Sequence, residues 1–194
     1  MPNFHGNRTH PKRKPNMCNC GEHIFVGCTR GLVTMADVES YDKIAAWNWT
    51  ATVSGHAMRR SKKTGKEETV FLHQAIIGVR DGYEPDHIDG NGMNNRRCNL
   101  RHATKAQNQM NRHAVVARSG FKGVTPNHHN WMATISKRDG GGVRRQRYLG
   151  THVDPVHAAL AYDMAARELF GAFAKTNFQQ LAPEFFDSKA YGAK

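Results

Sequence analysis

The sequence has no long apolar run, few cysteines and a shortage of acidic residues. No stretch approaches the roughly 20 apolar residues that a membrane-spanning helix needs, and the N-terminal MPNFHGNRTHPKRKPNMC lacks the apolar segment of a secretory signal. The four cysteines, Cys18, Cys20, Cys28 and Cys98, are too few and too unevenly spaced in 194 residues for a disulfide-stabilised scaffold. These absences argue against a membrane or secreted protein and favour a reducing, intracellular setting.

The chain has an excess of positive charge. Its 28 lysines and arginines against 16 aspartates and glutamates give a formal net charge of +12. Such a chain attracts nucleic acid, because each lysine or arginine that reaches a phosphate releases condensed counterions. A basic surface that binds nothing explains the charge equally well. Binding to a membrane surface is disfavoured, because no segment forms a basic amphipathic helix of useful length.

The length of 194 residues suits one ordinary domain or two small ones. The apolar pattern lapses at the N-terminus and again at Arg112–Ser119, so we expect two domains of α+β class. The Lys12–Lys14 cluster either adds phosphate affinity or is simply solvated. The expected ranges are a basic flexible tail at 1–21, a first domain at 22–112, a linker at 113–118, a second domain at 119–178 and a C-terminal tail at 179–194.

The first domain begins with short elements of both kinds. Residues 22–35 predict two strands around a turn at Thr29–Gly31, and Asp37 is placed to cap a short helix. Alternating polarity around Trp47 and Trp49 predicts that both indoles lie in the core. The string TVFLHQAIIG then predicts a strand that runs into a helix, after a charged turn.

The second domain has clear turn and helix signals. The strings FKGVTPN, NWMATISK and RRQRYLGT predict three strands joined by turns at 127–130 and 139–142. A helix follows, with Asp154 as its cap, Pro155 at its first position and Gly171 just past its end. A stripe of alanines in this helix predicts that it lies close against a three-stranded antiparallel sheet.

The stretch most informative about chemistry is EPDHIDGNGMNNRRCNLRHATKAQNQMNR, at 84–112. It predicts strand, loop, strand and helix, and the helix begins near Lys105 because Thr104 and Gln107 form a capping box. Such a segment suits hydrolysis of a phosphodiester, which needs a hard divalent cation held by oxygen ligands and a base to deprotonate water.

Four residues of this stretch can fill those roles. Asp86 and Asn108 offer a carboxylate and an amide oxygen for Mg²⁺ or Mn²⁺. His87 is an imidazole suited to act as general base near neutral pH, aimed at water where the strand ends. Asn99 on the return strand can hydrogen-bond the His87 backbone and so fix the direction of the ring.

This stretch, and DHIDGNGMNNRRCNLR in particular, resembles the HNH (ββα-metal) nuclease motif in the form found in phage and intron-encoded homing endonucleases. The resemblance implies that Asp86 and Asn108 bind metal, that His87 is the general base and that Asn99 is structural. It also implies that His73, in FLHQAIIG, lies near the scissile phosphate. A phage- or intron-encoded enzyme acting on double-stranded DNA in a bacterial cytoplasm is the implied setting.

Two alternatives stay open for this motif. The Asn, Asp and Gly residues also favour turns, so the segment could be a DNA-binding hairpin without catalysis, in a sequence-specific regulator. His73 could equally be a buried structural histidine. Nicking by a monomer and double-strand cleavage by a dimer both remain compatible with one site per chain.

The cysteines give little support for a structural zinc site. Cys18, Cys20, His23 and Cys28 could be imagined around zinc, but the Cys-x-Cys spacing is tighter than the usual pattern and Cys28 falls in a predicted strand. We expect no structural zinc, and we interpret Cys98 as a buried thiol without a special role.

The second domain resembles the Apetala/ethylene-response-factor DNA-binding domain of plants. The matching residues include Gly123-Val124, Trp131 and the runs Tyr148–Thr151 and Asn177-Phe178. The resemblance implies that the sheet enters the major groove of DNA. Which strand face meets DNA stays open, as does a merely solvated basic face. The candidate DNA-binding residues are Lys122, Trp131, Arg138, Arg144, Arg145 and Arg147.

Overall fold

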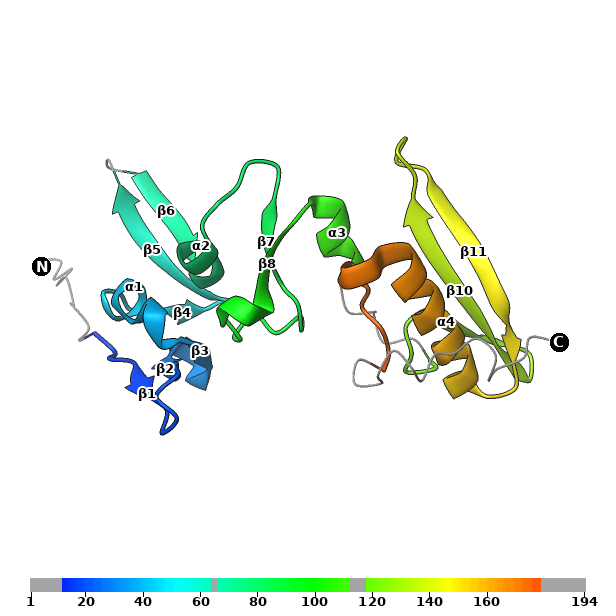
Figure 1. Ribbon diagram of the computed structural model, residues 1–194, viewed down its shortest axis with the longest axis horizontal. Coiled ribbons are helices and arrows are strands. Elements are labelled where there is room, and N and C mark those ends of the chain that lie inside the picture. The colour runs from blue at the N-terminus through cyan, green and yellow to red at the C-terminus, as the bar shows by residue number, and fades with distance from the viewer. Residues whose placement is uncertain (1–11, 64–65, 112–117, 179–194) are drawn as a thin grey trace, which may run out of the picture. The chain divides into compact units, whose positions relative to one another are not determined.

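The computed structural model of the protein describes residues 12–63, 66–111 and 118–178. The chain divides into two compact units, residues 1–104 and 105–194, which we describe one at a time (Figure 1). The expected linker lies almost wholly outside the described residues and the expected C-terminal tail lies entirely outside them. Of the expected flexible N-terminal tail, residues 12–21 are described, and they include a short strand at Asn16–Met17 that pairs with the strand His23–Gly27. No helix among the described residues is long and apolar enough to cross a membrane.

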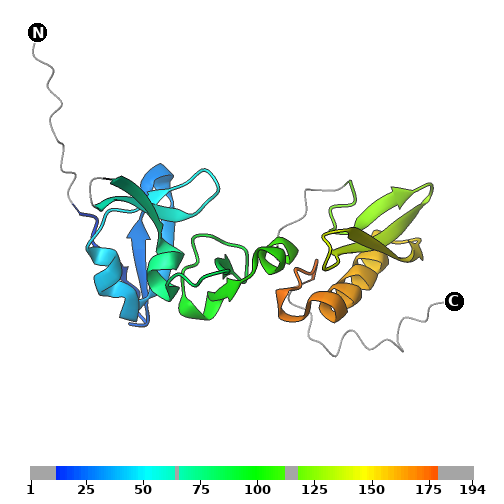
Figure 2. The same cartoon turned by 90° about the horizontal axis from the view of Figure 1, so that it is seen from above.

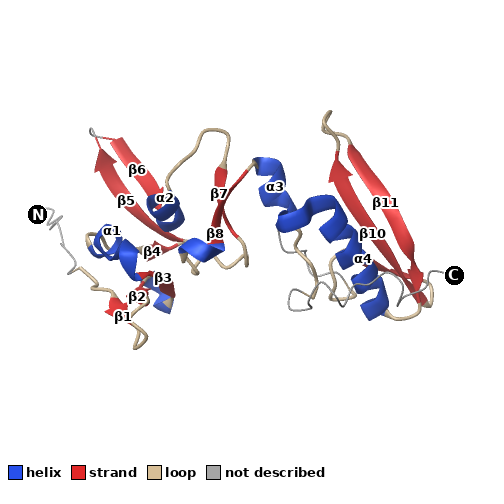
Figure 3. Cartoon of the chain, viewed as in Figure 1, coloured by secondary structure: helices blue, strands red, loops and turns tan. Residues whose placement is uncertain are grey.

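The first unit contains small antiparallel sheets and two short helices, as the expected α+β class requires (Figure 3). One sheet has the order β1-β2-β3, a second has the order β4-β5-β6, and β7 pairs with β8. The elements are β1 (Asn16–Met17), β2 (His23–Gly27), β3 (Val33–Asp37), α1 (Tyr41–Ala45), β4 (Thr50–Ala51), β5 (Ala57–Lys63), β6 (Lys66–Phe71), α2 (Leu72–Ile77), β7 (Glu84–His87) and β8 (Leu100–Ala103).

Most of the expected elements are confirmed here. The turn at Thr29–Gly31 separates β2 from β3, and β6 runs directly into α2. Asp37 differs from expectation, because its side chain makes no capping bond to the short helix. Its Oδ2 instead accepts a hydrogen bond from the Arg97 backbone at 2.6 Å, which ties β3 to the loop before β8.

The core of the first unit lies between its two three-stranded sheets and the helices. Ile24, Ile44, Trp49 and Leu72 are among its fully buried members. Trp49 fits the expectation at 1% exposed, but the expectation of a core position is wrong for Trp47, which is 41% exposed. The reason is that the Arg59 guanidinium stacks 3.8 Å above the Trp47 ring and gives the indole a cation–π partner at the surface.

The second unit is a three-stranded antiparallel sheet with one long helix on one face (Figure 2). The order is β11-β10-β9, and the punctuation expected for the long helix is confirmed: the Asp154 side chain accepts from Val156 N, and Gly171 follows the last turn. Its elements are α3 (Lys105–Met110), β9 (Val124–Asn127), β10 (Asn130–Arg138), β11 (Arg144–His152) and α4 (Pro155–Phe170).

Small residues bring α4 close to the sheet. Ala158 and Ala159 pack with Val124 and Ala133, and Ala165 and Ala166 pack near Ile135. Gly123 is required at this contact. A Cβ there would lie 2.0 Å from the Tyr162 ring, and its φ of +77° is a conformation that side chains disfavour. The helix therefore covers the sheet face that carries Ala133 and Ile135.

Candidate active site and nucleic-acid interface

The β7–β8 hairpin positions the two adjacent residues Asp86 and His87. Neighbouring residues of a strand point to opposite faces, and β7 ends at His87. Asp86 lies directly opposite Arg101 in the antiparallel register, and Arg101 Nε donates to Asp86 Oδ2 at 2.7 Å. Both Asp86 and His87 are buried. The hairpin thus holds a paired carboxylate and an imidazole at the end of one strand.

Asparagine side chains close the loop that follows His87. Asp89 N donates to Asn99 Oδ1 at 3.1 Å, and Asn99 Nδ2 donates to Asp89 Oδ1 at 2.9 Å and to Asn94 O at 2.8 Å. Burial acts to raise the pKa of Asp89, but hydrogen bonds from Asn91 N–H, Asn94 and Asn99 outweigh it and lower the pKa below its ordinary value. Asn99 therefore braces the loop through Asp89 and Asn94, whereas the bond from its side chain to the His87 backbone stays a prediction.

The ring of His87 is hydrogen-bonded to the side chain of Asn95. His87 Nε2 lies 3.1 Å from Asn95 Oδ1, and Asn95 Nδ2 donates to Thr34 Oγ1 at 2.8 Å and to Gly92 O at 3.1 Å. His87 is only 5% exposed, where we expected a ring reachable by water. The ring is buried because the loop and two other imidazoles pack around it.

Those imidazoles belong to His56 and His73. The ring centroid of His87 lies 5.1 Å from that of His73 and 5.5 Å from that of His56. Burial, reinforced by the neighbouring rings of His87 and His56, lowers the pKa of His73 from 6.5 to about 3. Burial is also the main cause that lowers the pKa values of His87 and His56. All three imidazoles are therefore neutral near pH 7, the form that can accept a proton.

Gly92 permits this close packing. A Cβ at Gly92 would lie 2.3 Å from Gly55 O and 2.7 Å from the His56 ring. The loop after His87 therefore needs glycine where it passes the segment before β5, and the His56 ring lies against it.

The Nδ1 atom of His73 is buried without a hydrogen-bond partner among the described residues.

The structure places the expected site residues in both units. His73 and His87 pack together, Asp86 adjoins His87, and Asn99 lies at the base of the same loop. Asn108 lies on α3, which belongs to the second unit, so a metal ion shared by Asp86 and Asn108 stays a prediction.

Sequence reasoning missed three residues of the first unit. Arg101 could have been found, because antiparallel pairing of the two expected strands places it opposite Asp86. Asn95 was included only among the turn-forming residues, although it is the ring's partner. His56 carried no signal, because its contact with the other imidazoles comes from tertiary packing.

The cysteines behave differently from expectation. Cys18 and Cys20 are joined by a disulfide, and Cys98 is exposed, so its interpretation as a buried thiol is wrong. Ligand atoms of Cys18, Cys20 and His23 all lie within 4.8 Å of one another, a grouping that could hold a metal ion. Thiolates are the metal-binding form of cysteine, so the disulfide would have to be reduced first.

In the second unit, the strand register sorts the candidate arginines by face. Ile135, which faces α4, pairs with Arg147, and Arg147 reaches Glu168 on α4 at 3.3 Å. Alternation places Arg145 on that same face, and it pairs with Asp139 at 3.1 Å. The helix-side arginines therefore already have carboxylate partners.

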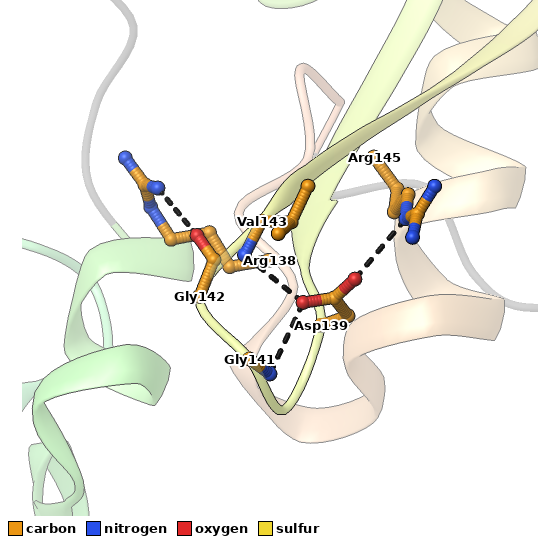
Figure 4. Close-up of polar contacts among 6 residues, drawn as sticks. All are labelled: Arg138, Asp139, Gly141, Gly142, Val143 and Arg145. Atoms are coloured by element: carbon orange, nitrogen blue, oxygen red, sulfur yellow. Dashed lines mark hydrogen bonds and ion pairs between the residues drawn. The ribbon is translucent and has the colours of Figure 1, made fainter.

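Arg138 and Arg144 lie on the open face. They are directly opposite each other across β10 and β11. Figure 4 shows that Arg138 and the helix-side Arg145 extend to opposite sides of the hairpin turn. Arg138 Nη1 donates to Gly142 O at 2.7 Å, and Arg144 Nη2 donates to Ser136 Oγ at 3.0 Å. Neither has a carboxylate partner among the described residues, so two uncompensated like charges face solvent.

Two other candidate DNA-binding residues have structural contacts. Trp131 is partly buried against the cluster of Val124 and Ala158. The Lys122 ammonium donates to Met110 O at 3.1 Å. Burial, with the charge of Lys175, lowers the pKa of Lys122 from 10.5 to about 8, against the opposing effect of Asp163.

Comparison with known proteins identifies part of this chain. Residues 77–110 match a family model described as HNH endonuclease. Over 156 residues, 79% of this chain and 79% of the relative, the chain is 29% identical to an uncharacterised HNH endonuclease of Acanthamoeba polyphaga mimivirus. Residues 77–110 are thus similar to HNH endonucleases, and this similarity supports nuclease function.

A shorter stretch resembles plant transcription factors of Arabidopsis thaliana. The chain is 47% identical to an ethylene-responsive transcription factor and 44% identical to an AP2-like ethylene-responsive transcription factor. Each similarity covers 62 residues, which is 31% of this chain and 14% and 17% of the two plant proteins.

Proposed function

We propose that the protein is a metal-dependent, homing-endonuclease-like enzyme that hydrolyses phosphodiester bonds in double-stranded DNA. The observation that carries the proposal is the placement of His87. Its buried imidazole adjoins Asp86 and packs against His73, and His87 lies within residues 77–110, which match the HNH endonuclease family. DNA binding is assigned mainly to the open sheet face of the second unit.

Asp86 and Asn108 would hold the metal ion. Carboxylate and amide oxygens are hard donors and suit Mg²⁺ or Mn²⁺, and Asp86 is kept at the strand end by Arg101. When bound, such a cation neutralises the charge that develops on the scissile phosphate. The donor set of Asp86 and Asn108 therefore fits the metal that an HNH nuclease requires.

His87 would take the proton from the attacking water. Burial keeps its imidazole neutral at neutral pH, which leaves one ring nitrogen able to accept a proton. His73 lies against the His87 ring and would face the phosphate, while Asn99 braces the loop that carries both Asp89 and Asn94. Each of these roles belongs to a residue that the HNH resemblance also singles out.

The decisive experiment is nicking of supercoiled plasmid DNA by the purified full-length protein. We expect nicking with Mg²⁺, none in excess EDTA, and recovery when Mg²⁺ is restored. His87→Ala should abolish nicking and spare DNA binding, while His157→Ala, at an exposed histidine of α4, should leave both unchanged. Wild-type protein that binds DNA but never nicks it with Mg²⁺ or Mn²⁺ would overturn the proposal.

The open sheet face is the proposed DNA-binding surface of the second unit. Arg138 and Arg144 repel each other across the strands, and a polyanion relieves this repulsion. We expect Arg138→Ala with Arg144→Ala to weaken DNA binding more than the matched control, Arg145→Ala with Arg147→Ala, whose residues are already ion-paired. A larger loss of binding for the control pair would assign DNA binding to the helix side instead.

The similarity to plant transcription factors favours a second candidate, a sequence-specific DNA-binding regulator without cleavage. The plasmid experiment separates the two functions. A regulator binds a preferred DNA sequence and leaves the plasmid supercoiled in every metal condition, whereas the nuclease converts it to the open circle.

A further inference from the structure

We infer that Asn95 is a positioning residue that sets the His87 imidazole in its Nε2–H tautomer and so makes Nδ1 the proton acceptor. The tautomer is argued from hydrogen bonds in the first unit alone. Only the catalytic use of Nδ1 rests on the proposed function.

The orientation of the Asn95 side chain is determined by its partners. Its Nδ2 lies 3.1 Å from the carbonyl oxygen of Gly92, and a carbonyl can only accept a hydrogen bond. Its second Nδ2 contact is Thr34 Oγ1 at 2.8 Å. The Thr34 hydroxyl donates its single proton to Met93 O at 3.0 Å, so it accepts from Asn95. Both contacts require the amide nitrogen on that side, which directs Oδ1 toward His87.

The tautomer follows from that orientation. Asn95 Oδ1 carries no proton, so the hydrogen bond of 3.1 Å to His87 requires the proton on Nε2. A neutral imidazole has one N–H group, and the remaining nitrogen, Nδ1, then keeps its lone pair. The hydrogen-bond partner of Nε2 thus leaves Nδ1 as the ring nitrogen that can act as a base.

The surrounding structure keeps Asn95 in place. Asn95 is 1% exposed, its backbone N donates to Met35 O at 2.8 Å, and Met35 N donates to Met93 O at 2.9 Å. Thr34 is buried as well. The residue that orients the ring is therefore fixed by β3, which lies about sixty positions earlier in the chain.

The test is ¹H–¹⁵N NMR of the histidine side chains of the full-length protein, without metal or DNA. The His87 signals are assigned by their loss in His87→Gln. We expect wild-type His87 to be protonated at Nε2, and Asn95→Leu to give a mixture of the two tautomers. Asn94→Ala removes a neighbouring brace of the same loop and should keep the Nε2–H form.

Cleavage is measured separately on the same variants. Asn95→Leu should lower kcat for nicking by about threefold to tenfold, the effect of one buried hydrogen bond, with KM for DNA unchanged. A wild-type His87 protonated at Nδ1, or an Asn95→Leu variant that keeps the pure Nε2–H form, overturns the inference. If the wild-type protein has the Nε2–H form but does not nick DNA, the proposed function fails while the tautomer assignment stands.

Discussion

At the scale of single residues, Gly92 makes the histidine cluster possible. Any side chain there would collide with Gly55 O and the His56 ring. We expect Gly92→Ala to displace the loop, to lower the free energy of unfolding by about 1–3 kcal/mol and to reduce nicking. Urea unfolding monitored by tryptophan fluorescence measures the loss. Gly140→Ala is the matched control, because nothing lies within 4 Å of its added Cβ, and an equal effect of both changes would contradict the steric argument.

Lys122 provides a prediction on pH dependence. Its pKa is lowered from 10.5 to about 8 in the folded protein. Between these two pH values the Lys122 side chain therefore holds its proton in the unfolded chain but loses it in the folded protein. Stability should therefore rise with pH across that window, and Lys122→Met should remove this rise. The measurement is the free energy of unfolding in urea at pH 8 and pH 10 for both proteins. Parallel pH dependence of the two would show that Lys122 keeps an ordinary pKa when folded.

The residues of the site differ in how far the sequence predicts them. Asp86 and His87 end β7 and Asn99 directly precedes β8, so the pairing of these two strands within one short motif determines their placement. Asn95 and His56 act through side-chain contacts with distant segments, and such contacts leave no periodic pattern in the sequence. Trp47 was misplaced for the same reason, because only the fold brings Arg59 over its ring.

At the scale of elements, α4 offers a test of its N-terminal cap. The Asp154 carboxylate accepts a hydrogen bond from Val156 N at 2.7 Å. Asp154→Ala should cost about 1 kcal/mol of unfolding free energy, because an N-terminal amide of the helix loses its acceptor. Asp154→Asn keeps the cap and should cost much less. Thermal unfolding followed by circular dichroism compares the two, and equal losses would exclude a capping role for this side chain.

Elements with local signals were predicted well. The cap, the initial proline and the final glycine of α4 lie within a few positions of the helix ends, and the turns of β9–β11 carry Gly, Asn and Asp. The pairing of β3 with the loop at Met93–Asn95 could not be predicted, because it joins segments about sixty residues apart. Local chemistry thus specifies the elements, and packing specifies how the site is assembled from them.

At the scale of the whole molecule, the charge of +12 predicts DNA affinity that falls steeply with salt. His87→Ala should leave the slope of log Kobs against log salt concentration unchanged, because it removes no phosphate contact. Arg138→Ala with Arg144→Ala should reduce that slope by about 2 if both residues contact phosphate. Fluorescence anisotropy of labelled duplex DNA at several salt concentrations measures it. A reduced slope for His87→Ala would contradict the separation of cutting from binding.

The hydrogen bonds between β3 and the loop around Asn95 also set a lower limit on how small a piece of the chain can keep the His87 ring oriented. The matched HNH segment begins at residue 77, yet Thr34 and Met35 hold the side chain and backbone of Asn95. A graft of residues 77–110 onto another scaffold would carry the imidazole but leave behind the strand that orients it. A transplanted segment that keeps this orientation has to include β3.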